Sequence, residues 1–587
     1  MAAKVSAGEE PWKGSWDILV NNTDGFLDDV AGAQEVIYVD SDRSPSNYIR
    51  LARDCAKAYQ LALRFHGSGK EVFARKAVEI LNAWASIHER WDGDSNVKLR
   101  AGLYGCQFAC AAELLRDYEG WSRPDFDKFR HYMRDRFHPL NADFLERHNG
   151  TVDGHYWANW DLANMSSVLA IGVLCDDRRM FEEGVKYFRE GVGTGSVGNA
   201  VVHVHPNGLG QWQESGRDQG HSLMGPQLMG IVCEIAWNQG VDLYGFMDNL
   251  FLRGVEYVSK YNVGGEVPFV TYVREWGHVG MEKYEINPVV SPDGRGALRP
   301  GWDLVYHHYV NRRGLSAPFT NSYAERCRPE GGGFNYGGNS GGFDSLGFTT
   351  LTHGRDPIGK GVPPSSLRVV VEGDAVSVSW MGSADAEGYR VKRSMKKGGP
   401  YELIAEVDSS EQFHIDSGLQ VGVTYFYVVS AVVPGGEAMD SCEVEATPDA
   451  RLVGRVIGTD GSYGDRGADK SAAFDGSLEN YFDPPGLGAW VGLDLGSMAR
   501  INEVRYCPRD GFGSRMIGGR FQASNSPDFS QGVAELLTIV EEPKEGVMTS
   551  RNVGERGLFR YVRYIAPADG GWCNVAELQF TGERAER

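Results

Sequence analysis

The feature that most constrains the fold is a series of long segments whose apolar residues recur at helical spacing. Seven of them lie between residues 48 and 261, namely YIRLARDCAKAYQLALRF (48–65), VFARKAVEILNAWASI (72–87), GLYGCQFACAAELLRDY (102–118), WDLANMSSVLAIGVLC (160–175), RRMFEEGVKYFREGV (178–192), LMGPQLMGIVCEIAWNQG (223–240) and LYGFMDNLFLRGVEYVSKY (243–261). Long helices joined by short loops predict an all-α (α/α)n toroid, or incomplete barrel, over 10–355. A helical bundle or a solenoid is the alternative, but no repeat of roughly 34 or 40 residues supports a solenoid.

The pattern changes near residue 355. The segment GRDPIGKGVPPSS (354–366) is rich in Gly, Pro and Ser, as linkers are. After it, LRVVVEG, AVSVSW, GYRVKRS and TYFYVVSAVV alternate with a period of two between turn residues, which predicts an Ig-like β-sandwich over 363–448. The tail, 451–583, is also rich in strand patterns and predicts a second all-β domain, a jelly-roll sandwich. We therefore expect a multidomain chain of one helical and two β domains.

Composition restricts the partners. The 587 residues carry a formal net charge of −20, which argues against nucleic acid but not against an acidic substrate, because local arginines can outweigh a distant acidic surface. No run of eighteen apolar residues predicts a membrane span. The nine cysteines form no CxxC motif, so a zinc module is not expected, and Cys507 and Cys573 could pair. No apolar leader is visible at the start, yet the β domains favour a secreted, periplasmic or cell-surface protein.

The stretch QESGRDQGH (213–221) is the strongest candidate for chemistry. If a helix begins here, Glu214, Arg217, Asp218 and His221 fall within an arc of about 100°. The same face continues into small and apolar residues, so the polar stripe is expected in the wall of a cleft, where charges must be paired or functional. A salt-bridge lattice without function is the alternative.

Three further segments offer candidate residues. NGTVDGHYWANWDLAN (149–164) combines tryptophans with amides, a usual lining of sugar sites, and supplies Trp157, Asn159, Trp160 and Asn164. RPGWDLVYHHYVNRRGL (299–315) and YNVGGEVPFVTYVREW (261–276) supply Tyr306, Tyr309, Arg312, Tyr261, Tyr272 and Arg274. The HVH motif at 203–205 could hold a metal on a strand, but no nearby carboxylate completes a site, so we expect no metal.

Several ordered segments carry a family resemblance. NWDLANMSSVLAIGV, QWQESGRDQGHSLMG, EIAWNQGVDLYG, EYVSKYNVG and WDLVYHHYVNRRGL together resemble the alginate-lyase-like polysaccharide lyases, which are α/α-toroid enzymes that cleave uronic-acid polymers. The resemblance covers about 10–350 and implies β-elimination on alginate or β-1,4-glucuronan, with a His/Tyr pair and no cofactor. The NNHSYW string of the better-known alginate lyases is missing here, and GHYWANW is only a loose counterpart that makes His155 a second candidate histidine.

The β domains carry resemblances of their own. Trp380, Tyr389 and TYFYVVSA (424–431) resemble a fibronectin type III module, with Tyr425 at the position of its tyrosine corner. AAFDGSLENYF, WVGLDLG, INEVRYCPRD, GRFQASNS and YVRYIAPADGGWCNVAELQF occur in the order found in discoidin-like (galactose-binding-like) carbohydrate-binding modules. That second resemblance implies a glycan partner for the C-terminal module.

The chemistry of β-elimination assigns roles to the candidates. The enzyme must neutralise a uronate carboxylate, remove the C5 proton with a base and protonate the glycosidic oxygen. Histidine suits the base and a phenol the acid, so we expect His221 as base and Tyr309 as acid, with Tyr306 and then Tyr261 as rival acids. Asn159 and Arg217 are expected to neutralise the carboxylate, with Asn164 as rival amide, and Glu214 and Asp218 to orient Arg217 and His221.

Two other functions compete with the lyase. A glycoside hydrolase on the same toroid would use a carboxylate pair, for example Glu214 with Asp161 or Asp303. A non-catalytic glycan-binding or adhesion protein would use the toroid as a scaffold. The concentration of polar residues in three separate toroid segments favours an enzyme.

Overall fold

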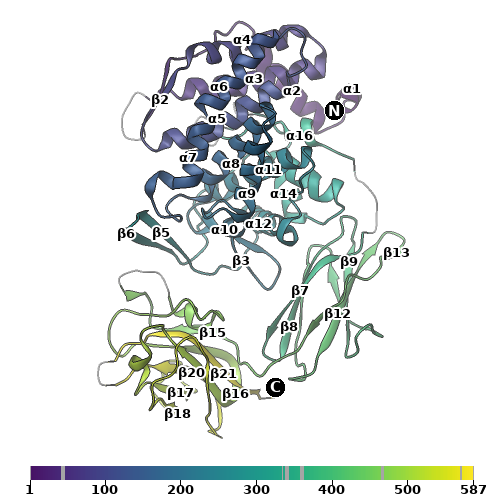
Figure 1. Ribbon diagram of the computed structural model, residues 1–587. Helices are drawn as coiled ribbons and strands as arrows, with labels where there is room; N and C mark the ends of the chain where they lie inside the picture. The colour runs from purple at the N-terminus through teal and green to yellow at the C-terminus, as the bar shows by residue number, and fades with distance from the viewer. Residues whose placement is uncertain are drawn as a thin grey trace.

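The computed structural model describes residues 2–40, 46–332, 335–336, 343–356, 362–463, 469–554, 556–568 and 571–585. Helices dominate up to His353 and strands follow from Ser365, so the predicted fold class, a helical region followed by β domains, is confirmed (Figure 1). No helix in these ranges has the length and apolar character that a membrane span requires.

Four long helices form the inside of the helical domain. They are α3 (Ile49–Ser68), α5 (Asn96–Glu113), α8 (Ala158–Leu174) and α11 (Gln219–Asn238). Each packs on the next, α3 on α5, α5 on α8 and α8 on α11. Gly102 and Gly105 let α5 approach α8 closely, since a Cβ at these positions would lie 2.8 Å from the Ala163 carbonyl carbon and 2.2 Å from Ser167 Oγ. Gly102 faces Ala163 and Gly105 faces Ser167, so the residue numbers increase in the same direction along both helices, and α5 and α8 run parallel.

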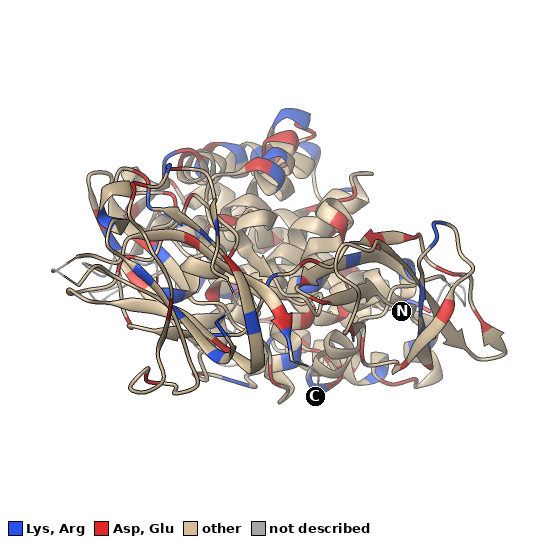
Figure 2. Ribbon diagram, turned by 90° about the horizontal axis from the view of Figure 1, so that it is seen from below, with Lys and Arg blue, Asp and Glu red and all other residues tan. Residues whose placement is uncertain are grey.

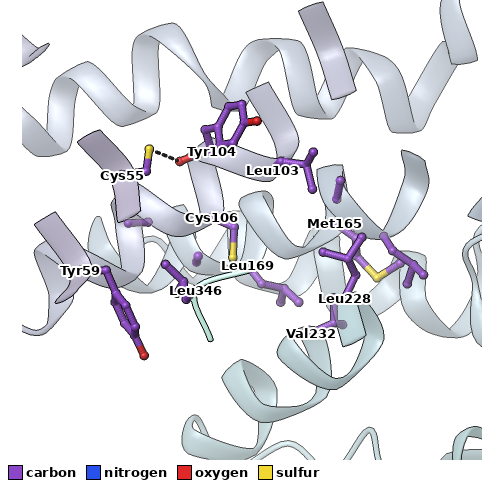
Figure 3. Packing of buried hydrophobic residues seen from close by; sticks show 14 of the residues in the cluster. Cys55, Tyr59, Leu103, Tyr104, Cys106, Met165, Leu169, Leu228, Val232 and Leu346 are labelled. Carbon is purple, nitrogen blue, oxygen red and sulfur yellow. Dashed lines mark hydrogen bonds between the residues drawn. The ribbon is translucent and has the colours of Figure 1, made fainter. Parts of the chain in front are cut away.

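Buried apolar side chains from all four inner helices meet in the centre of the domain (Figure 3). Cys55 and Tyr59 of α3 lie beside Tyr104 and Cys106 of α5, and the Cys55 thiol donates to the Tyr104 carbonyl at 3.6 Å. α3 and α5 are therefore also parallel. The small residues predicted on the packed faces allow this close arrangement, because an Ala, Gly or Cys side chain leaves room for the neighbouring helix.

The remaining helices surround the inner four and close the ring. They are α1 (Ala2–Ala7), α2 (Trp12–Asp24), α4 (Glu71–Ile87), α6 (Arg123–Arg136), α7 (His138–Arg147), α9 (Arg178–Glu190), α10 (Val197–Ala200), α12 (Phe246–Asn262), α13 (Trp302–Tyr306), α14 (Pro318–Cys327) and α16 (Thr349–His353). α13 packs on α11, α16 on α13, α2 on α16 and α3 on α2. This circuit is the α/α toroid expected from the sequence.

Three small two-stranded sheets interrupt the helical domain, and the helical interpretation of this region did not predict them. β1 (Val36–Val39) pairs with β2 (Arg90–Gly93), β3 (Val201–Val204) with β4 (Gly210–Trp212), and β5 (Tyr272–His278) with β6 (Met281–Asn287). The turn between β5 and β6 contains Gly280 at φ +83°, a conformation that favours glycine. Short strands like these are hard to detect because they have too few residues to show a period.

The first β domain is a sandwich of two sheets with strand orders β10-β9-β12-β13 and β11-β8-β7, and β14 also pairs with β12. Its strands are β7 (Ser365–Glu372), β8 (Ala375–Met381), β9 (Gly388–Ser394), β10 (Glu402–Asp408), β11 (Phe413–Asp416), β12 (Tyr425–Val433), β13 (Gly436–Glu437) and β14 (Val444–Ala446). Trp380, Tyr389 and Tyr427 fill the space between the sheets. The Tyr425 hydroxyl accepts a hydrogen bond from Gln420 N at 3.1 Å, which ties the start of β12 to the loop before it.

The last domain is a seven-stranded β structure in which the order β15-β16-β20-β17-β18 is extended by β19 and β21, both paired with β16. Its strands are β15 (Arg455–Gly458), β16 (Trp490–Pro508), β17 (Arg520–Ser524), β18 (Ala534–Thr538), β19 (Thr549–Asn552), β20 (Leu558–Ile565) and β21 (Val575–Arg584). Cys507 and Cys573, which the sequence allows to pair, are both buried free thiols.

Both β domains contact the helical domain. Ser316 N donates to Gly382 O at 2.7 Å, and Thr271 Oγ1 donates to Asp469 Oδ2 at 2.9 Å. Thr271 directly precedes β5, so the C-terminal domain lies next to the β5–β6 hairpin, as Figure 1 also shows. Basic and acidic residues are interspersed over all three parts of the chain (Figure 2).

Candidate active site

The candidate site lies where the inner helices begin. Tyr48 directly precedes α3, Arg100 is in the second turn of α5, and Asn159 and His221 are in the first turns of α8 and α11. Because these helices are packed in parallel, their N-terminal ends lie at the same end of the toroid. Helix N-termini carry a partial positive charge and free N–H groups, so this end of the domain favours anions.

A buried carboxylate links two of the segments singled out in the sequence. Glu214 is 0% exposed, and its Oε1 accepts from Asn159 Nδ2 at 2.9 Å and from Arg217 Nη1 at 3.0 Å. Burial raises the pKa of Glu214, and the positive charges of Arg217 and His221 oppose that rise. The structure thus brings the 149–164 and 213–221 segments into one hydrogen-bonded group.

His221 is held by Asp218. Its Nδ1 lies 2.7 Å from Asp218 Oδ2, and its backbone N donates to Asp218 Oδ1 at 2.8 Å, which makes Asp218 the N-cap of α11. Burial alone would raise the pKa of Asp218, but its hydrogen bonds with His221 and the charge of Arg217 lower it. The carboxylate therefore fixes a proton on Nδ1 and leaves Nε2 as the basic nitrogen. Nε2 lies 3.3 Å from Arg217 Nη2, and the imidazole side chain is 35% exposed.

The local backbone differs from the single helix expected from Gln213 onward. Residues Gln213–Gly216 form a short 3-10 helix, and α11 begins only at Gln219. Asp218 is extended between them, at φ −167° and ψ 162°. The break lets Asp218 fold back onto the first turn of α11, which a continuous helix would prevent.

The β5 strand adds aromatic and basic groups to the same network. The guanidinium groups of Arg217 and Arg274 lie over the Trp157 ring, at 5.1 and 4.4 Å from its centroid. The Tyr272 hydroxyl accepts from Gln213 Nε2 at 2.8 Å, and its ring centroid lies 6.3 Å from that of Trp157. Burial raises the pKa of Tyr272, so its phenol remains protonated at neutral pH.

The structure contradicts the predicted role of Tyr309 as the acid. Tyr309 is 0% exposed, and its hydroxyl donates to Tyr244 O at 2.9 Å inside the helical core. A π-helical turn over His307–Arg312 follows α13 and changes the direction of the side chains, so the spacing of an ideal helix does not hold here. No polymer can reach this phenol.

Arg312 and Tyr306 also lie outside the network. Arg312 forms a 2.9 Å ion pair with Glu234, which is near the C-terminal end of α11, opposite to His221. This contradicts its predicted contact with substrate. Tyr306 is half-buried, with the Arg328 guanidinium 5.3 Å from its ring centroid.

The other predicted residues of this region have structural partners. Tyr261 is buried beneath the Arg295 guanidinium, 3.8 Å from the ring centroid. Asn164 is buried and donates to Trp160 O at 2.9 Å, while the half-exposed Trp160 ring packs on Tyr156 at 4.4 Å. His155, the second candidate histidine, accepts from Gly277 N at 2.9 Å and so anchors the β5–β6 hairpin.

Four residues near His221 were missed by sequence analysis. Arg299 Nη1 lies 3.4 Å from Oδ2 of the buried Asp344, and the Arg100 guanidinium lies 4.4 Å from the Tyr48 ring centroid. Burial raises the pKa of Asp344, and the charges of Arg299, Arg100 and His221 all oppose the rise, so the groups share one electrostatic environment. The one sequence feature that could have identified this group is Arg100, a charged residue among the mostly buried residues of α5.

The carboxylates proposed for a hydrolase are not placed for that reaction. Asp161 is buried and engaged by His148 Nε2 at 2.9 Å and Gly195 N at 2.8 Å. Asp303 is buried and accepts from Arg328 Nε at 2.8 Å. With Glu214 also buried, none of the three carboxylates can flank a glycosidic bond.

The C-terminal domain has a candidate glycan site of its own, a cavity of about 280 Å³. Its lining consists of four aromatic residues, two arginines and two other polar residues, namely Tyr463, Tyr481, Phe512, Trp572, Arg509, Arg515, Ser462 and Asp483. Arg509 pairs with Asp483 and stacks on Tyr481 at 3.8 Å. Within the ranges that the structure describes, no group of three or more His, Cys, Asp or Glu side chains is arranged to hold a metal ion.

The chain is similar to several solved structures and to one family model. No curated protein matches it. Among solved structures it is similar to CBM62 from Clostridium thermocellum Xyl5A, at 46% identity over 23% of this chain and 99% of that chain, with a TM-score of 0.22. It is also similar to an Fn3-like protein from Clostridium thermocellum, at 36% identity over 15% of this chain and 92% of that chain (TM-score 0.14). Truncated AlyQ with CBM32 and alginate lyase domains is 15% identical over 23% of this chain and 34% of that chain (TM-score 0.19).

A family model described as alginate lyase matches residues 29–269. The matched range contains all four inner helices together with Glu214, Arg217, Asp218 and His221. Residues 29–269 therefore carry an alginate lyase family domain, and this domain makes the protein a polysaccharide lyase.

Proposed function

We propose that the helical domain cleaves a uronic-acid polysaccharide, alginate or β-1,4-glucuronan, by β-elimination. The observation that carries this proposal is the hydrogen-bonded group in which Glu214 holds Arg217 and Asp218 holds the adjacent His221. It places a guanidinium next to a histidine whose Nε2, which lies 3.3 Å from Arg217 Nη2, carries no proton and can take one, and this is the pair that elimination beside a carboxylate requires.

Arg217 neutralises the substrate carboxylate. Its side chain is 27% exposed, and it already shares Glu214 with the amide of Asn159. Since a guanidinium donates along a fixed planar fork, it can bind Glu214 on one side and a uronate carboxylate on the other. Neutralising that carboxylate stabilises the enolate-like charge that develops when the C5 proton leaves. Asn159, which is buried, acts through Glu214 as a positioning residue.

His221 is the base and Tyr272 the acid. The C5 proton passes to His221 Nε2, the electron pair of the C5–H bond forms the C4–C5 double bond, and the C4–O bond breaks. The leaving glycosidic oxygen takes a proton from the Tyr272 hydroxyl. Tyr272 replaces the expected Tyr309 because it is half-buried and its hydroxyl accepts a hydrogen bond from Gln213, the residue that directly precedes Glu214. Asp218 stabilises the imidazolium formed after proton transfer.

The two β domains are proposed to have different roles. The C-terminal domain binds glycans, and the sandwich before it connects that domain to the helical domain. The sandwich at 363–448 has the buried Trp380 and the Tyr425 hydrogen bond expected of a fibronectin type III module. The domain at 451–583 has the Tyr463–Trp572 pair, with ring centroids 5.7 Å apart, beside two arginines in its cavity. Aromatic faces and charged donors are the groups that bind sugars. A polymeric substrate and a glycan module together favour a secreted or cell-surface protein.

The decisive experiment incubates the full chain with alginate, glucuronan and pectin, and follows the near-ultraviolet absorbance of unsaturated uronides. We expect product on alginate or glucuronan, and none with His221→Ala. A hydrolase would release reducing ends without this absorbance, and a binding protein would release neither. Absence of unsaturated product on every polyuronate would contradict the proposal.

A further inference from the structure

We propose that Gln213 is a positioning residue for the acid of the elimination. Its side-chain amide turns the phenolic proton of Tyr272 toward the substrate and stabilises the phenolate that remains after the proton has left. This inference rests on the proposed lyase function and deepens it, because it specifies how the acid is prepared. The proposed base, His221, has a partner of this kind in Asp218.

The two ends of the Gln213 amide are fixed by their partners. Oε1 accepts from the backbone N of Ala158 at 3.3 Å, and Nε2 lies 2.8 Å from the Tyr272 hydroxyl. A backbone N–H can only donate, so the end that faces Ala158 is the carbonyl oxygen, and the end that faces Tyr272 is the NH2 group. Gln213 is 1% exposed, so bulk water does not compete for either contact. The amide therefore donates to the phenolic oxygen.

This donation decides where the phenolic proton points. A phenol carries one proton, and its oxygen accepts through its lone pairs. Because the amide of Gln213 occupies a lone pair, the O–H bond of Tyr272 has to turn away from Gln213. Among the residues that the structure describes, no acceptor lies within hydrogen-bond distance of this proton. The Tyr272 side chain is half-buried and not enclosed, so a bound substrate can supply the acceptor.

The same contact makes the proton easier to transfer. Burial raises the pKa of Tyr272, whereas the hydrogen bond from Gln213 and the charge of Arg274 lower it. Ala158 is the first residue of α8, so its N–H is one of the free groups at the N-terminus of that helix. The partial positive charge of the helix terminus polarises the amide through Oε1 and so strengthens its donation to a phenolate. Gln213 thereby offsets part of the cost of ionising a phenol in this environment.

Gln213 and Glu214 serve the two sides of the reaction. Glu214 holds Arg217, which binds the substrate carboxylate, and Gln213 holds Tyr272, which protonates the leaving oxygen. Both residues belong to the 3-10 helix Gln213–Gly216. The carboxylate-binding group and the acid are therefore anchored to adjacent residues of one short, buried segment.

The test compares Gln213→Glu with the wild type and with Asn149→Asp. Glutamate has the shape of glutamine and still accepts from Ala158 N, but an ionised carboxylate accepts the phenolic proton and no longer donates to the phenolic oxygen. Asn149 is a matched control because its Nδ2 also donates to a phenol, that of Tyr156 at 2.9 Å, which has no part in the proposed reaction. The apolar Gln213→Met is a second variant, and thermal unfolding of each full-length variant shows whether it is folded.

Two measurements distinguish the orientation of a proton from a general loss of structure. The first is kcat on an oligouronide and on a uronide that carries nitrophenoxide at C4, a leaving group that departs without a proton. The second is a fluorine NMR titration of the same variants with Tyr272 replaced by fluorotyrosine. It reports the pKa of this phenol and needs no turnover.

We expect both Gln213 variants to lower kcat on the oligouronide about ten- to hundredfold, the range of a hydrogen bond to a charged group. Their kcat on the nitrophenoxide substrate should stay close to that of the wild type, and the pKa of the fluorinated phenol should rise. Asn149→Asp should change neither quantity. An equal loss on both substrates, or a phenol pKa that neither Gln213 variant raises, would overturn the inference. If the wild type forms no unsaturated product although the pKa rises as expected, the lyase proposal fails and the donation from Gln213 to Tyr272 stands.

Discussion

The Asp218→Asn substitution separates the structural role of Asp218 from its role in proton transfer. Asp218 accepts two hydrogen bonds from the same residue, one from the backbone N of His221 at 2.8 Å and one involving Nδ1 at 2.7 Å. Asparagine is an equally good N-cap, so the first bond survives, and the free energy of unfolding should fall by only about 1 kcal/mol, from the lost charge interactions with His221 and Arg217. The second bond loses its charge, and the amide no longer fixes the proton on Nδ1.

The catalytic cost follows from that second bond. A hydrogen bond to a charged group contributes about 1.5–3 kcal/mol, which corresponds to roughly a ten- to hundredfold fall in kcat if the bond strengthens with the imidazolium. The assay is the initial rate of unsaturated-product formation on a polyuronate, with thermal unfolding as the control for folding. The reasoning would be refuted by a variant that keeps the wild-type kcat, or by one whose activity falls only as far as its folded fraction.

Four further substitutions test the other assignments. Tyr272→Phe should lower kcat by about a hundred- to ten-thousandfold because it removes the proposed acid. Tyr309→Phe should leave kcat unchanged and cost only about 1–2 kcal/mol of stability, from the lost hydrogen bond to Tyr244. The opposite pattern would make Tyr309 the acid. Burial raises the pKa of Glu256 from 4.5 to about 7, so its contribution to stability is fully present below pH 4.5 and lost as the pH rises through 7. The unfolding free energy of the wild type relative to Glu256→Gln should therefore fall by about 3 kcal/mol over this window, and a pH-independent difference would contradict the assignment. Trp572→Ala should weaken glycan binding by the C-terminal domain about ten- to hundredfold and leave cleavage of short oligouronides intact; unchanged glycan affinity would remove the cavity as the binding site.

The architecture could be predicted because its signals are long. The inner helices are long segments of mostly apolar and small residues, several of them buried on nearly all sides, and the change to a period of two marks the β domains clearly. The short β5–β6 hairpin could not be predicted, although it carries Tyr272 and Arg274 to the candidate site. A seven-residue strand with no fully buried face has no distinctive pattern.

The candidate site was predictable where residues are close in sequence. Glu214, Arg217, Asp218 and His221 lie within eight positions, and local hydrogen bonds keep them together even though the helix begins later than expected. Tyr309 could not be placed correctly, because a π-helical turn changes which side of the segment faces the core. Arg100 and its neighbours could not be found at all, since their proximity to His221 depends on the packing of segments that are far apart in the sequence.

The most direct test of the central claim is the product formed from a homopolymeric polyuronate by the wild type and by His221→Ala. We predict a rise in near-ultraviolet absorbance from the C4–C5 double bond with the wild type, and no rise with a folded His221→Ala variant that still binds the polymer. New reducing ends without that absorbance, or undiminished elimination by His221→Ala, would contradict it.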